Sequence, residues 1–204
     1  MLRMSMGAGI GTKGVPRAER EHQIVDEAIA EFAACGYAGA SMVDIARRAG
    51  ISKPLVYQYF GSKDGLYLAC LHTVTGGLLD RLHEAELAVD DTVASRIHPL
   101  RAIFEALAPQ RDAWRMLYDS SLPTTGPIAH AAHGYQQQMK QIAASGSARF
   151  LRARGIRSSR DAEVLSQVWM GIVGSLVEWW LANPDESAAQ MTARCQRLLT
   201  AVLD

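Results

Sequence analysis

The sequence predicts an all-α protein in which a small N-terminal helical domain precedes a larger helical bundle. Apolar residues recur at helical spacing almost throughout, and capping residues, glycines and prolines separate the periodic segments. No segment shows the alternation of apolar and polar residues that is typical of a half-buried strand. The 204 residues are 49% hydrophobic and 21% charged, which is enough apolar side chain for a sizeable core. We expect about nine helices.

The first four helices have clear start and stop signals. One apolar helical face covers residues 24–33, and Gly36 is expected to end that helix. A serine is placed to cap each of the next three helices: Ser41, Ser52 and Ser62. Asp44 completes a capping box with Ser41, and Pro54 fits in the first turn of the third helix.

The remaining helices are longer and are divided by loops. The segment Asp90-Asp91-Thr92 ends the fourth helix, and Ser158 or Ser159 is expected to cap the eighth. Asn183 is expected to cap the last helix, with Pro184 at its first helical position. The expected ranges of the fifth, sixth, seventh and ninth helices are 94–108, 112–120, 128–154 and 184–204, and the eighth is expected to run from its serine cap to residue 182.

Several classes of protein are excluded by composition and motifs. The three cysteines are far apart, which disfavours a disulfide scaffold or zinc site and favours a reducing cytosol: Cys35, Cys70 and Cys195. Residues 1–14 do not read as a signal peptide, and the most apolar stretch, 169–182, is shorter than the roughly 20 residues of a membrane span. His130 and His133 lack a third metal ligand, and no catalytic motif occurs. We therefore expect a cytoplasmic protein that is not an enzyme, with no catalytic residue, metal, cofactor or membrane partner.

Residues 41–63, SMVDIARRAGISKPLVYQYFGSK, read as two short helices around a tight Ala-Gly-Ile turn. That is the helix-turn-helix arrangement, whose second helix lies in the major groove of DNA. This helix is too short to add much core, yet it carries Leu55, Gln58 and two tyrosines, a surface that favours a partner. Lys53 and Lys63 lie at helix N-termini, where a cation opposes the helix dipole by roughly 0.3–1 kcal/mol unless an anion such as phosphate binds.

The segment from Phe32 to Leu66 resembles the DNA-binding domain of the TetR family of bacterial transcriptional regulators. The motifs that carry the resemblance are Gly36-Tyr37, Ser41-x-x-Asp44-Ile45-Ala46, Ala49-Gly50-Ile51-Ser52, Tyr57-x-Tyr59-Phe60 and Ser62-Lys63-x-x-Leu66. The resemblance covers roughly the first third of the chain. It implies a flexible N-terminal arm at 1–16, a helix-turn-helix DNA-binding domain at 17–63, and a ligand-binding and dimerisation domain at 64–204.

The same resemblance implies roles for individual residues in binding a double-stranded DNA operator. The residues expected to face base edges are Lys53, Pro54, Leu55, Tyr57 and Gln58. The residues expected to contact phosphates are Ser41, Tyr59 and Lys63. Leu55 departs from the small or hydroxyl residue that the family often has there. The alternative for the two tyrosines is packing within the small domain, and for Arg47 and Arg48 it is a favourable position at a helix C-terminus.

The larger domain is expected to bind a small molecule and to form a homodimer. A set of large, mostly aromatic side chains is the candidate ligand pocket: Phe104, Trp114, Tyr118, His133, Met139 and Trp169. Two apolar stripes are the candidate dimer interface: Leu165, Val168, Ile172, Leu176, Met191, Cys195, Leu198 and Val202. The alternative for both sets is ordinary core within one chain.

The expected function is a repressor that leaves a palindromic operator when a small-molecule effector, whose identity the sequence does not give, binds the larger domain. The alternative is a DNA-bound adaptor whose larger domain binds a protein. Gly76 and Gly77 are expected to let the fourth helix bend or fray and so carry the signal. In the cell the protein would be bacterial, cytoplasmic and nucleoid-associated when bound to DNA.

The zero net charge hides opposite charges on different segments. Residues 1–18 carry three basic residues and no acid, and residues 45–63 carry four basic residues and no acid. Residues 19–31 carry five acids against one arginine. We therefore expect DNA binding with a small salt dependence, set by a handful of phosphate contacts per subunit.

Overall fold

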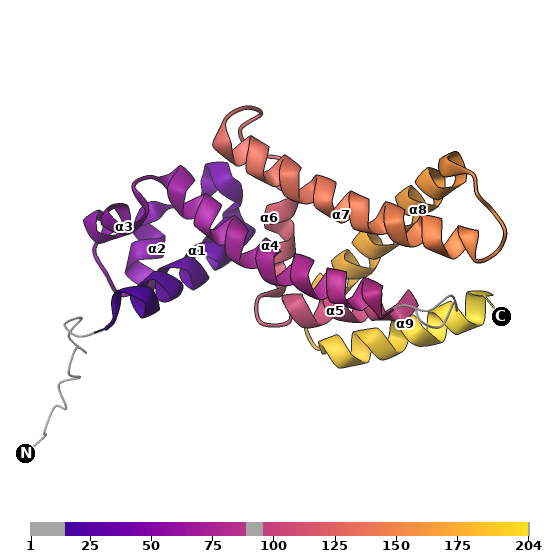
Figure 1. The fold of residues 1–204 in the computed structure, drawn as a ribbon. Helices are drawn as coiled ribbons and strands as arrows, with labels where there is room; N and C mark the ends of the chain where they lie inside the picture. Colours follow the sequence, from indigo (N-terminus) through magenta and orange to yellow (C-terminus); the bar gives the residue numbers. More distant parts are fainter. Residues whose placement is uncertain (1–14, 89–95, 204) are drawn as a thin grey trace, which may run out of the picture.

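The computed structural model describes residues 15–88 and 96–203, and this part of the chain is helical with no strand (Figure 1). Residues 1–14, which are most of the expected arm, and the Asp90-Asp91-Thr92 break lie outside it. The helices are α1 (Arg17–Gly39), α2 (Met42–Arg48), α3 (Lys53–Phe60), α4 (Lys63–Leu87), α5 (Ile97–Leu107), the 3-10 turn η2 (Arg111–Ala113), α6 (Trp114–Leu117), α7 (Pro127–Arg152), α8 (Ser159–Leu181) and α9 (Ala188–Leu203). The all-α prediction is confirmed.

The predicted stop at Gly36 is a break in the backbone, although one more turn follows before α1 ends. Gly36 has φ 68°, in the left-handed region that favours glycine, and the amide of Ala40 donates to its carbonyl at 3.1 Å. Upstream of the break, Ile24, Ala28 and Phe32 are at most 1% exposed. The apolar face read from the sequence therefore holds α1 in the core.

Three of the serine caps are confirmed and one is not. The hydroxyl oxygens of Ser41, Ser62 and Ser158 accept the backbone N–H three residues later, at 3.2, 3.0 and 3.2 Å. Ser52 has the extended backbone of an N-cap, but its side chain caps no N–H group. Pro54 lies in the first turn of α3 as predicted.

The last helix begins later than the Asn183-Pro184 signal predicted. Asn183 instead donates its side-chain N–H to the Trp179 carbonyl at 2.7 Å. The cap of α9 is Ser187, whose hydroxyl accepts the Gln190 N–H at 3.2 Å while the Gln190 side chain accepts the Ser187 N–H at 2.8 Å. This reciprocal capping box satisfies more backbone groups than an asparagine cap would, and it fixes the start of the helix.

The sixth helix is also shorter than predicted. Residues 111–113 form the 3-10 turn η2, and α6 ends at Leu117 rather than near residue 120. Tyr118 leaves the helical conformation with φ −125°. The Asp119 carboxylate then accepts the Ser121 N–H at 2.8 Å, which stabilises a turn in place of further helix.

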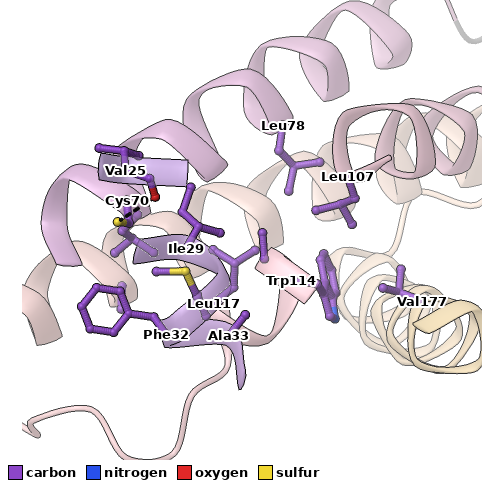
Figure 2. Close-up of a cluster of buried hydrophobic side chains, with 14 of the residues drawn as sticks. Val25, Ile29, Phe32, Ala33, Cys70, Leu78, Leu107, Trp114, Leu117 and Val177 are labelled. Carbon is purple, nitrogen blue, oxygen red and sulfur yellow. Dashed lines mark hydrogen bonds between the residues drawn. The ribbon is translucent and has the colours of Figure 1, made fainter. Parts of the chain in front are cut away.

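Helix α4 joins the two ends of the molecule. It packs against α1 and α3 on one side, and against α5 and α7 on the other (Figure 1). Figure 2 shows one apolar cluster that continues from Val25, Ile29 and Phe32 through Leu117 and Trp114 to Val177. The N-terminal helices and the bundle therefore share a core.

Candidate nucleic-acid interface and effector cavity

The exposed face of α3 is formed by residues that the sequence singled out. Val56 is fully buried and anchors the helix, whereas Lys53, Pro54, Tyr57 and Gln58 are exposed. Leu55 is half-buried. With Val56 inward, the five predicted base-facing residues are left on or near the surface of one short helix.

The three predicted phosphate-contacting residues lie on different elements, with Ser41 before α2, Tyr59 on α3 and Lys63 at the start of α4, and their side chains differ in how many protein contacts they make. Ser41 caps α2, so its hydroxyl already accepts the Asp44 N–H. Tyr59 is half-buried against the core, and its ring lies under the guanidinium of Arg17, 5.2 Å from the ring centroid. The roles of these residues at DNA stay predictions.

The ammonium group of Lys63 contacts residues at the C-terminal end of α1. Its ammonium donates to the carbonyl of Ala40 at 2.8 Å and to that of Ala38 at 3.3 Å, and it lies 5.0 Å from the Tyr37 ring centroid. A lysine ammonium has three donors, so this arrangement leaves room for one further partner. The phosphate role of Lys63 also stays a prediction.

A buried carboxylate that the sequence reasoning missed holds the helix-turn-helix in place. Glu31 on α1 is 4% exposed and accepts the Ser41 N–H at 3.0 Å, at the start of α2. Its other oxygen is paired with Arg48, the last residue of α2. One side chain thus binds both ends of α2. In the predicted capping box Asp44 would have satisfied the Ser41 N–H; instead Asp44 pairs with Arg47.

The loop after α6 forms hydrogen bonds to the residues that follow the Gly36 break in α1. The Asp119 carboxylate accepts the Tyr37 N–H at 2.6 Å, and the Ser121 hydroxyl accepts the Ala38 N–H at 3.1 Å. A β-carbon at Gly36 would lie 2.9 Å from the Ser121 oxygen. Glycine is therefore required at Gly36 both by the positive φ and by this contact.

Two hydrogen bonds tie α6 itself to the neighbouring helices. The buried Tyr67 hydroxyl on α4 donates to the Met116 carbonyl at 2.9 Å, and the Gln136 amide on α7 donates to the Leu117 carbonyl at 2.7 Å. Burial raises the pKa of Tyr67, so its hydroxyl stays protonated as a donor. Short as it is, α6 connects α1, α4 and α7.

An apolar cavity of about 430 Å³ lies in the bundle between α5, α7, α8 and α9. Its lining residues are Glu86, Arg96, Pro99, Leu100, Ala143, Gly146, Ser147, Phe150, Leu165, Val168, Trp169, Ile172, Leu176, Cys195, Leu198 and Leu199. Val168, Ile172 and Leu198 of this lining are also exposed on the surface. The volume falls in the range of about 300–1,000 Å³ that small-molecule pockets occupy.

One end of this cavity is polar. Glu86 accepts hydrogen bonds from Arg149 at 2.5 Å, and Arg149 also donates to the Glu86 carbonyl at 2.8 Å. The Glu86 carboxylate packs on Gly146, where a β-carbon would lie 2.8 Å from it. Arg96 lies 4.8 Å from the Phe150 ring centroid. The remaining lining is almost wholly aliphatic or aromatic.

Of the six predicted pocket residues, only Trp169 lines this cavity. Phe104, Trp114 and Met139 are at most 5% exposed and belong to the shared core. Tyr118 and His133 are on the surface. Large side chains fill space, so they mark the core, whereas the cavity is left by smaller aliphatic residues that the sequence reasoning did not choose.

The predicted dimer residues divide into three groups. Met191 and Cys195 are 1% exposed and lie in the core of the protomer. Leu165 and Leu176 are half-buried at the cavity, and the Val202 side chain lies outside the described part. The remaining three, Val168, Ile172 and Leu198, are 53%, 43% and 51% exposed.

The surface of α8 extends this exposed group. Val164 is 63% exposed and Trp179 is 42% exposed, and both follow the helical spacing of Val168 and Ile172. Sequence reasoning missed these two, although the same spacing predicts them. We call the face formed by Val164, Val168, Ile172 and Trp179 the α8 face.

By length and mean hydropathy, α8 is also the one helix in the described residues that could cross a membrane. Its most apolar window is 22% buried in the protomer, because the α8 face has no neighbour there. Among the described residues no group of three histidines, cysteines or acids is placed to hold a metal ion. The expectations about membrane and metal stay predictions.

Helices α2 and α3 form a helix-turn-helix in which α3 is exposed, and they lie next to a bundle that contains a cavity of ligand size. These features define the class of the protein as a helix-turn-helix protein. Residues 24–70 match the model of the N-terminal domain of the bacterial regulatory proteins of the tetR family. FasR, a transcriptional activator of Mycolicibacterium smegmatis, is 32% identical over 115 residues, which is 56% of this chain and 52% of FasR. The helix-turn-helix part of the chain thus matches the TetR family, as its sequence motifs predicted.

Solved structures share the whole fold. A TetR-family regulator from Bordetella parapertussis is 25% identical, with a TM-score of 0.71 over 88% of this chain and 93% of that one. FadR from Bacillus subtilis, solved in complex with stearoyl-CoA, is 19% identical, with a TM-score of 0.67 over 87% and 96% of the two chains. The chain spans about half the length of the first curated relatives it matches. These relatives are transcriptional regulators and not enzymes, in agreement with the expectation from the sequence.

Proposed function

We propose that this protein is a DNA-binding transcriptional regulator that contacts its operator through α3. The observation that carries the proposal is the exposed face of α3, where Lys53, Pro54, Tyr57 and Gln58 surround a buried Val56. The glutamine can bond adenine bidentately, and the proline and Leu55 can pack on a thymine methyl group. Ser41, Tyr59 and Lys63 contact the flanking phosphates and set the register. Residues 17–63 form the DNA-binding domain and residues 64–204 the regulatory one.

The cavity between α5, α7, α8 and α9 is the effector site in this proposal. Its nearly apolar lining favours a hydrophobic molecule, and the polar end at Glu86 and Arg149 supplies hydrogen-bonding groups that orient it. The structural neighbour FadR, whose structure contains stearoyl-CoA, is compatible with a hydrophobic effector. The effector prefers a second arrangement of the protein and lowers DNA affinity by its differential binding, typically about 1–3 kcal/mol. The protein then acts as a repressor released by its ligand.

The alternative function is a DNA-bound adaptor whose larger domain binds a protein. A solidly packed bundle would favour the adaptor, whereas a cavity of about 430 Å³ favours a small-molecule sensor. A thermal-shift screen against metabolites and drugs separates the two, because a ligand that binds only the folded protein raises its melting temperature.

We infer that the protein works as a homodimer in the cytoplasm. The exposed α8 face, with Leu198 beside it, supplies an apolar surface of the kind that a two-fold partner covers. A dimer presents two copies of α3, which fits a palindromic operator with half-sites roughly 34–36 Å apart or a multiple of that.

Selection of bound sequences from random double-stranded DNA tests the proposed function directly. The expected result is an enriched palindrome, and substitution of Gln58 by alanine should change the base preference at one position in each half-site. A selection with the wild-type chain that enriches no sequence would overturn the proposal. Arg101→Gln, an exposed change on α5, is a matched control that should leave the selected sequence unchanged.

A further inference from the structure

The cations of the N-terminal helices fall into two groups by their partners. Of the six arginines and lysines in residues 15–63, four have hydrogen-bonded protein partners: Arg20, Arg47, Arg48 and Lys63. The side chains of the other two, Arg17 and Lys53, have no hydrogen bond or ion pair within the described residues. Both are exposed. They are therefore the two cations of this region whose donors are all free of protein partners in the described residues.

Each of these two cations lies against a tyrosine of α3, the recognition helix of the helix-turn-helix. The Lys53 ammonium is 5.8 Å from the Tyr57 ring centroid, and the Arg17 guanidinium carbon is 5.2 Å from the Tyr59 ring centroid. Lys53 is the first residue of α3 and Tyr59 is near its end. The recognition helix thus has a cation at both ends, and the second one comes from α1.

We propose that Arg17 is a phosphate-binding residue that works as a pair with Tyr59. A guanidinium that lies over a ring keeps its N–H donors at the edge, where they can form a bidentate bond to a phosphate. The Tyr59 hydroxyl also lacks a hydrogen-bond partner in the described residues, so two donors lie close together. Contact with the ring restricts Arg17 before DNA binds, which reduces the side-chain entropy lost on binding.

This inference rests on the proposed DNA binding, and it adds a contact from α1 to the surface formed by α2 and α3. In this proposal both ends of α1 have a role. Arg17 lies beside the recognition helix, and the Gly36 break is held by Asp119 and Ser121 of the regulatory part.

The test is a salt titration of binding to a labelled duplex that carries the palindrome selected by the wild-type chain. Arg17→Gln should reduce the slope of log affinity against log salt by about 0.9 for each phosphate that Arg17 no longer neutralises, or about 1.8 for a dimer. The base preference should stay unchanged, because a phosphate contact carries no sequence information. Arg17→Lys keeps the charge and should restore the slope, with weaker binding because an ammonium lacks the guanidinium fork.

Two further variants make the result decisive. Tyr59→Phe keeps the ring under Arg17 and removes the hydroxyl, so it should weaken binding with the slope nearly unchanged. Arg101→Gln removes an exposed arginine from α5 and should change neither quantity. The proposal is overturned if Arg17→Gln matches Arg101→Gln in slope and affinity while the wild-type chain binds. Failure of the wild-type chain to select any duplex would instead overturn the proposed function, and this inference with it.

Discussion

The Asp119 carboxylate accepts the Tyr37 amide N–H at 2.6 Å and so joins the loop after α6 to the broken end of α1. The two residues lie 82 positions apart in the chain, one in the loop after α6 and one near the end of α1. Neither was singled out as a site residue by sequence reasoning. Together with the bond from the Ala38 N–H to the Ser121 hydroxyl, their bond ties the end of α1 to this loop.

Loss of this link should weaken the fold. Asp119→Ala leaves the Tyr37 and Ser121 amides without their acceptor, so we expect the free energy of unfolding to fall by about 1–3 kcal/mol. Urea denaturation followed by circular dichroism measures it. Asp112→Ala is the control, because Asp112 forms an exposed ion pair with Arg115 whose loss should cost less than about 1 kcal/mol. Equal effects of the two substitutions would contradict the prediction.

Glu31 should be a second sensitive position, because one buried carboxylate binds both ends of α2. Glu31→Gln removes the charge paired with Arg48 but leaves an oxygen for the Ser41 N–H, so we expect a loss of about 1–3 kcal/mol. A double-mutant cycle with Arg48→Gln should show a coupling energy well above zero. The exposed Asp44 and Arg47 pair is the comparison, and Arg47→Gln should cost less than about 1 kcal/mol. Additive effects of Glu31→Gln and Arg48→Gln would show that the ion pair contributes nothing.

Gly76 and Gly77 lie within α4, which runs without interruption from Lys63 to Leu87. A β-carbon at either position would meet nothing within 4 Å, so the double alanine variant fits the fold. We expect it to stabilise the protein by up to about 1 kcal/mol per site through helix propensity, to keep operator binding, and to lose the effector response. Operator binding measured with and without a compound from the thermal-shift screen checks this. Unchanged release by that compound would remove the glycine pair from the mechanism.

Ionisation of Tyr37 should lower the free energy of unfolding at alkaline pH. Its hydroxyl donates to Asp64 at 2.5 Å, and this bond together with burial raises the pKa of Tyr37 from 10.0 to about 12. The raised value means that the folded state favours the protonated phenol, so this contribution is complete below pH 10 and is lost as the pH rises to about 12. Tyr37→Phe should therefore be less stable than the wild type at pH 8 and lose less stability between pH 10 and pH 12. Parallel curves for the two proteins in urea denaturation would contradict this assignment.

The exposed α8 face predicts that the chain forms a dimer through this surface. Ile172→Glu places a charge in the middle of that face, and we expect it to convert a dimer into monomers at micromolar concentration in sedimentation velocity. Val43→Glu makes the same change at an exposed valine on α2 and should leave the mass unchanged. A wild-type chain that sediments as a monomer, or a variant that stays dimeric, would exclude this face as the interface.

The parts of the fold that depend on local chemistry could be predicted from the sequence. The caps at Ser41, Ser62 and Ser158 need only neighbouring residues, and the break at Gly36 follows from the residue type; all four are present. The start of α9 could not be predicted in this way. There the Asn183-Pro184 signal competes with the Ser187 capping box and with the Trp180 indole N–H, which donates to the Glu186 carbonyl at 2.8 Å.

The candidate site residues show the same difference between features set by local sequence and features set by long-range packing. The face of α3 follows from a short motif, because burial of Val56 decides where its neighbours lie. The cavity depends on packing between helices far apart in the chain, and a residue such as Trp114 belongs to the core only because α1, α5 and α8 surround it (Figure 2). The burial of Met191 and Cys195 likewise depends on α9 packing against α5.

The apolar cluster that continues from Val25 and Ile29 to Val177 has a thermodynamic consequence. Because the N-terminal helices and the bundle share a core, one part cannot open while the other stays intact. The chain should behave as one cooperative unit, so that the most protected amides of α1 exchange with solvent at the same rate as those of α5. Any signal that reaches α3 then has to travel as a displacement of intact helices, and not as the melting of a domain.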